Sequence, residues 1–123
     1  MGAKLSSKQQ AQLAYLETLP PKLHRIKTVI EEMSSLRVDD LTLKGFCRML
    51  DEIKANANQL SINTLADTAG LMSTMARRGG GLQMKVRGLR ELLVSLKSGY
   101  DMAMRSATTP EVLPGAEEGI PER

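Results

Sequence analysis

Apolar residues recur along much of the chain at alternating intervals of three and four, the spacing that gathers them on one face of an α-helix. The clearest stripe, in a helix expected from about Asp40 to Leu60, consists of Leu43, Phe46, Leu50, Ile53, Ala57 and Leu60. Weaker stripes predict helices over about 6–18 and 21–33, a fourth between about 65 and 78, and a fifth over about 82–105. No segment shows the alternation of apolar and polar residues that is typical of a strand.

Residues that interrupt helices separate these segments. Pro20 and Pro21 lie between the first and second helices, Asp39 or Asp40 can cap the third, and the glycines at 79–81 end the fourth. Because short connections favour antiparallel neighbours, the pattern predicts an all-α fold: an up-and-down antiparallel four-helix bundle with an additional N-terminal helix. This domain is expected to cover residues 1–107.

The last part of the chain differs in composition. Residues 108–123 contain three prolines and show no helical periodicity, so we expect a flexible acidic tail. Four acids and one base give this segment a net charge of −3. Since the whole chain carries +3, residues 1–107 carry +6. A basic domain suits an acidic partner or nucleic acid, but no basic run and no interleaved aromatic residues indicate nucleic-acid binding.

Composition narrows the class of protein further. The chain has only three aromatic residues, so the core must consist mainly of aliphatic side chains, methionine and alanine. No apolar run approaches the ~18 residues of a membrane span, and the N-terminus lacks the apolar stretch of a signal peptide. Cys47 is the only cysteine, which excludes a disulfide framework and a multi-cysteine metal site. We therefore expect a cytoplasmic protein without membrane association, metal or cofactor.

Asp51 is the first candidate functional residue. At 100° per residue, the centre of the apolar stripe lies roughly 140° from it, so its side chain is expected to face solvent. Arg48 and Lys54 lie three residues before and after it, a spacing that allows contact. An acid between two bases is also common on an ordinary solvent-exposed helix face that has no functional role. The residues expected on the same side are Lys44, Cys47, Arg48, Lys54, Ala55 and Asn58.

Residues 50–65 resemble the signature of histidine-containing phosphotransfer (HPt) domains. Counted from the phosphoacceptor histidine, the signature has an aliphatic residue at +2, lysine at +3, small residues at +4, +6 and +7, and further leucine, small and aliphatic positions up to +14. The matching residues here are Ile53, Lys54, Ala55, Ala57, Asn58, Leu60, Ser61, Ile62 and Leu65. The position of the histidine itself holds Asp51. The resemblance spans about residues 6–105.

The resemblance implies a role in two-component signalling. In the family, the exposed histidine takes a phosphoryl group from the phospho-aspartate of a response regulator. The lysine and nearby bases steady the phosphoryl oxygens, and small neighbours let the regulator approach. Asp51 removes that nucleophile. Carboxylates accept phosphoryl groups in receiver domains, beside a divalent metal and an acidic pocket, which this helix does not offer.

We therefore expect a phosphorelay module that is not an enzyme and that binds a receiver domain or a histidine kinase as a decoy, adaptor or inhibitor. The contact surface would be the side of the helix that carries Asp51. A monomer is favoured.

Three alternatives remain open. His24, with Ile26 and Lys27 at +2 and +3, could be the phosphoacceptor, although Thr28 and Ile30 then replace small residues. Residue 51 could naturally be histidine, altered to aspartate in this chain. The bundle could instead belong to a small helical chaperone or scaffold protein that presents an apolar surface to its partners.

Overall fold

The structure, a computed structural model, describes residues 4–78 and 80–110. This part of the chain forms five helices and no strand. They are α1 (Ser7–Leu16), α2 (Pro20–Ser34), α3 (Asp40–Gln59), α4 (Asn63–Arg77) and α5 (Leu82–Thr108). The predicted all-helical fold is confirmed for the described residues. None of these helices combines the length and the apolar character needed to cross a membrane.

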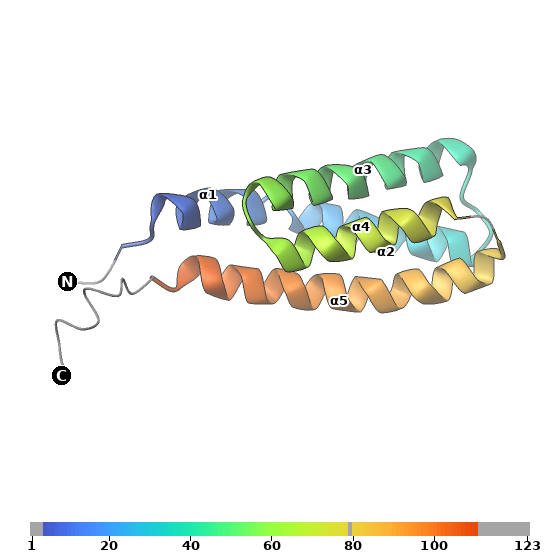
Figure 1. The fold of residues 1–123 in the computed structure, drawn as a ribbon. Helices are drawn as coiled ribbons and strands as arrows, with labels where there is room; N and C mark the ends of the chain where they lie inside the picture. The colour runs from blue at the N-terminus through green and yellow to red at the C-terminus, as the bar shows by residue number, and fades with distance from the viewer. Residues whose placement is uncertain (1–3, 79, 111–123) are drawn as a thin grey trace.

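Figure 1 shows α2, α3, α4 and α5 side by side, with α3, α4 and α5 each reversing the direction of the helix before it. The most extensive packing is between α3 and α4, followed by α4 with α5 and α2 with α5, and α2 also touches α3. The shorter α1 lies against α5, at the end of the molecule where α5 finishes. Thus α3, which carries Asp51, has α4 as its principal neighbour.

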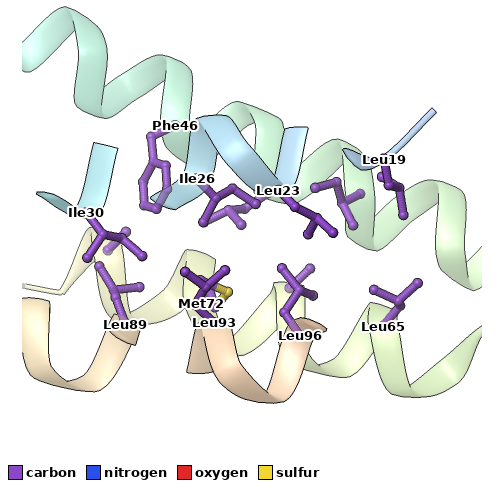
Figure 2. Packing of buried hydrophobic residues seen from close by; sticks show 14 of the residues in the cluster. Leu19, Leu23, Ile26, Ile30, Phe46, Leu65, Met72, Leu89, Leu93 and Leu96 are labelled. Atoms are coloured by element: carbon purple, nitrogen blue, oxygen red, sulfur yellow. The ribbon is translucent and has the colours of Figure 1, made fainter. Parts of the chain in front are cut away.

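The apolar stripes form a single core (Figure 2). Phe46, Leu50, Ile53 and Ala57 of α3 are at most 2% exposed, as the spacing predicts. They meet apolar residues of the other helices, including Ile26, Ile30, Leu65, Met72, Leu89 and Leu96. The predicted stripe is less buried at its ends, where Leu43 and Leu60 pack against the core but remain partly exposed. The buried seam turns the opposite side of α3 outward.

Local hydrogen bonds fix both ends of α3. Asp39 is the N-cap, and its side chain accepts a hydrogen bond from the Thr42 amide at 2.7 Å. After Leu60, Ser61 adopts a left-handed conformation with φ 62°, and the Ile62 amide donates to the Ala57 carbonyl at 2.8 Å. The 20 residues between these caps set the direction in which each side chain of α3 points.

Two glutamines of α1 bond to the ends of other helices. The side-chain amide of Gln9, a residue only 2% exposed, donates to the carbonyls of Ser106 at 2.9 Å and Thr109 at 2.6 Å. Gln12 donates in the same way to the Leu60 carbonyl at 2.8 Å. Carbonyls in the last turn of a helix lack partners within the helix, so α1 satisfies groups that would otherwise be exposed or unpaired.

Gln9→Leu is expected to lower the free energy of unfolding by about 1–3 kcal/mol, because it leaves two carbonyls at the end of α5 without their donor and the Ser6 amide of the α1 capping box without its acceptor. Urea unfolding followed by circular dichroism measures the change. The control is Gln10→Leu, since Gln10 is exposed and bonds only locally, to Leu5. Equal losses in the two variants would contradict a stabilising role for the contact between α1 and α5.

The boundary of the predicted tail needs correction. Thr108, the expected first residue of the tail, is the last residue of α5, which extends three residues beyond the expected end at Arg105. The reason is tertiary: Ala107 is fully buried, and Gln9 caps the final turn. Residues 111–123, the remainder of the predicted acidic tail, lie outside the described residues.

Candidate functional site

The carboxylate of Asp51 lies between α3 and α4 and accepts three hydrogen bonds from α4. Its Oδ1 accepts from Ser73 Oγ at 2.6 Å and from Arg77 Nη1 at 3.1 Å. Its Oδ2 accepts from Arg77 Nη2 at 2.6 Å. The guanidinium and the carboxylate thus face each other with two parallel hydrogen bonds, the strongest geometry for such a pair. Asp51 is nevertheless not buried, since its side chain is 46% exposed.

The sequence of α4 positions both donors. Ser73 and Arg77 are four residues apart and therefore lie one turn apart on the same side of the helix. Ser73 is 3% exposed, and its hydroxyl also accepts a hydrogen bond from Arg77 Nη1. Because α3 and α4 run antiparallel, a position near the middle of α3 meets the last turns of α4. Asp51, Ser73 and Arg77 form one hydrogen-bonded cluster.

This cluster changes the acidity of the carboxyl group. The hydrogen bonds from Arg77 and then from Ser73 lower the pKa of Asp51 to about 2, and the charge of Lys54 adds a smaller effect in the same direction. Partial desolvation opposes these effects but is outweighed. Asp51 is therefore ionised throughout the physiological pH range, and its charge is paired with that of Arg77.

The helical spacing allows Asp51 to contact Arg48 and Lys54, but neither base forms an ion pair with it in the structure. Among the described residues, its only ion pair is with Arg77. The side chain of Lys54 instead packs against Gly70 of α4, since a Cβ placed on Gly70 would be 3.2 Å from Lys54 Cδ. The guanidinium of Arg77 occupies both carboxylate oxygens, so the two bases on the same helix are not needed to neutralise Asp51.

Cys47, which was expected on the contact surface, lines the site but is nearly buried. The residue is only 6% exposed, and this burial raises the pKa of its thiol. On α3 it lies about 40° from Asp51, on the side that α4 covers. Cys47 therefore contributes to the floor of the site and not to its accessible rim.

An open groove of about 660 Å³ adjoins Asp51 where α3, the end of α4 and the start of α5 meet. It is lined by Asp40, Leu43, Lys44, Cys47, Arg48, Asp51, Ala76, Arg77 and Lys85. The structure thus brings four of the sequence-predicted site residues to one groove: Lys44, Cys47, Arg48 and Asp51. Lys54, Ala55 and Asn58 are exposed on α3 but do not line it.

The sequence reasoning missed the contributions of α4 and α5. Arg77 had a ready explanation as a cation at a helix C-terminus, and Ser73 and Lys85 showed no distinguishing pattern. The one available signal was the four-residue spacing of Ser73 and Arg77, which acquires meaning only once α4 is known to lie beside Asp51.

His24 lies elsewhere on the molecule. It is exposed on α2 and lines a separate hollow of about 370 Å³ with Lys27, Lys97, Tyr100 and Asp101, among others. It is not among the residues that line the groove at Asp51. The two candidate positions for a phosphoacceptor are therefore in different surroundings.

Asp51 is an ionised carboxylate whose position is fixed by hydrogen bonds to Ser73 and Arg77. All three hydrogen bonds to its carboxylate come from protein groups, and no group of three or more His, Cys, Asp or Glu residues within 4–78 and 80–110 could hold a metal ion. Comparisons of the chain with protein families, with curated proteins and with solved structures found no match. The site must be interpreted from its own geometry.

Proposed function

We propose that this protein is an HPt-like module of a two-component system that binds a receiver domain or a histidine kinase without accepting a phosphoryl group. The observation that carries the proposal is the state of Asp51. It occupies the histidine position of the HPt-like signature, on the side of α3 away from the core, and both of its oxygens are held by Ser73 and Arg77. On this proposal, α2–α5 are the four-helix bundle of the family and α1 is an addition.

The hydrogen bonds make Asp51 a poor phosphoacceptor. Attack on a phospho-aspartate requires a lone pair aimed at phosphorus, but three of the roughly four acceptor sites of this carboxylate hold hydrogen bonds from Arg77 and Ser73, which fix its orientation toward α4. A pKa of about 2 also marks a weakly basic carboxylate, and weak bases are weak nucleophiles. The phosphorylated aspartate of a receiver domain has a divalent cation beside it, whereas Asp51 has the guanidinium of Arg77.

The surface around Asp51 is nevertheless suited to binding. Lys44, Arg48, Ala55 and Asn58 are all exposed on the same helix. Ala55 and Asn58 are small, so the loops of a partner could approach the backbone of α3 closely. A module that binds a receiver domain but returns no phosphoryl group would act as a decoy, adaptor or inhibitor.

The experiment combines binding with phosphotransfer. The full chain is incubated with receiver domains of the same organism, each phosphorylated with labelled phosphate, and binding is measured separately by calorimetry. At least one receiver domain or histidine kinase should bind, and no label should pass to the wild-type chain. Asp51→His should acquire label that is acid-labile and stable to base, since it restores the nucleophile beside Lys54 and Arg77.

Two results would contradict the proposal. Label on the wild-type protein that disappears in His24→Ala would show an active phosphotransfer protein that uses His24. Absence of binding to every receiver domain and kinase tested would remove the module from two-component signalling and would favour the chaperone or scaffold alternative.

A further inference from the structure

The groove beside Asp51 has an excess of positive charge that the protein itself does not neutralise. Its lining includes four bases and two acids. Asp51 and Arg77 neutralise each other, which leaves Lys44, Arg48 and Lys85 against Asp40. None of these three bases forms an ion pair with any residue that the structure describes. The groove therefore presents about two uncompensated positive charges.

The floor of the groove is apolar. Cys47 and Ala76 are at most 6% exposed, and Leu43 packs partly against the core. Two large apolar side chains, Leu41 and Met84, are each 80% exposed and directly follow or precede groove residues in the chain. A basic rim above an apolar floor suits a ligand that carries both carboxylates and an aliphatic group.

We propose that this groove binds a short acidic segment of a protein partner. Carboxylates of the segment would pair with Lys44, Arg48 and Lys85, and an aliphatic side chain would cover Leu43, Cys47 and Ala76. The volume of about 660 Å³ accommodates a few side chains, which a short segment supplies. Single-stranded nucleic acid fits less well, because no aromatic residue lines the groove to stack on a base.

Asp51 sets the charge of this site. Because Arg77 is paired with Asp51, an acidic segment meets three bases without an ion pair and not four. One of them, Lys85, is partly buried, and its Nζ also donates to the Ala76 carbonyl at 3.4 Å. Removing the charge of Asp51 should release Arg77 and strengthen binding of an acidic ligand. A site built to bind a cation would show the opposite response.

The test uses a synthetic hexapeptide of alternating acidic residues and leucine, titrated into the ¹⁵N-labelled full chain. Amide shifts should concentrate at Lys44, Cys47, Arg48, Ala76 and Lys85. The variant Lys44→Glu/Arg48→Glu should bind about tenfold more weakly. A matched control, Lys8→Glu/Arg25→Glu, alters the net charge equally at exposed positions outside the groove and should change affinity by less than about twofold. Asp51→Asn should bind about two- to threefold more tightly.

Equal weakening in both double variants, or shifts spread over all basic residues, would overturn the groove as a specific site. So would unchanged affinity for a peptide with glutamine in place of each acid. The wild-type spectrum serves as the reference for correct folding, and the altered residues are all exposed except Asp51, which is half-exposed.

That the acidic segment belongs to a receiver domain or histidine kinase rests on the proposed function. The preference of the groove for an acidic segment does not depend on it. If the peptide binds in the groove and no receiver domain or kinase binds, the inference stands and the proposed function fails. If a receiver domain binds the wild-type chain without transfer of label, and the peptide shifts lie outside the groove, the inference fails and the proposed function stands.

Discussion

Arg77→Met is expected to raise the pKa of Asp51 from about 2 toward the ordinary aspartate value of about 3.9. Arg77 supplies the largest contribution to the lowered value through its two hydrogen bonds, and methionine keeps much of the side-chain volume without the charge. NMR titration of the side-chain carboxyl carbon measures this pKa directly. The part of the shift that remains in the variant reports the bond from Ser73 and the charge of Lys54.

Arg48→Met is the matched control for this experiment. Arg48 lies three residues before Asp51 on the same helix, where simple helical spacing predicts a contact, but it forms no ion pair with Asp51 in the structure. The pKa of Asp51 should therefore change little in this variant. A shift as large as that in Arg77→Met would contradict the arrangement of α3 against α4.

The lowered pKa also determines how stability depends on pH. A carboxyl group that is more acidic in the folded state stabilises the fold above its unfolded pKa of about 3.9, and this contribution is lost as pH falls through about 2. Asp51→Asn should thus be less stable than wild type at pH 5–7, and the difference should shrink as the pH falls below about 4 and vanish below about 2. Since Asp51 is nearly half exposed, solvent screening limits the difference to about 1 kcal/mol or less.

Leu50→Ala is expected to lower the free energy of unfolding by about 2–5 kcal/mol. Leu50 is fully buried in the seam of α3, and removing most of its side chain leaves a cavity among the packed helices. A loss of this size is a large part of the 5–15 kcal/mol that is typical of a small domain. Urea denaturation followed by circular dichroism provides the measurement.

Leu41→Ala is the control, because the same substitution then occurs on the same helix at a leucine that is 80% exposed. Its effect on stability should stay within about 0.5 kcal/mol. Similar losses in the two variants would mean that the apolar stripe does not face the core.

The sequence predicted the fold of the described residues well where the evidence was local. The repeat of Phe46, Leu50, Ile53 and Ala57 follows from 3.6 residues per turn, and all four are buried. The same geometry placed Asp51 outside the seam, where the structure has it half-exposed. It did not predict the burial of Cys47, because the angle from Asp51 indicates a direction but not which neighbouring helix covers that direction.

The sequence by itself determined the helical segments, their capping and breaking residues, and the face of α3 that is buried. Only the tertiary structure decided that Asp51 is paired with Arg77 and Ser73. The physical reason is that backbone geometry sets the spacing of residues within one helix. Ser73 and Arg77, in contrast, follow Asp51 by 22 and 26 residues in the sequence, so their contacts with it depend on how α3 and α4 pack. The basic groove could not be predicted from the sequence for the same reason, because Lys44 and Arg48 of α3 and Lys85 of α5 line it together only in the folded protein.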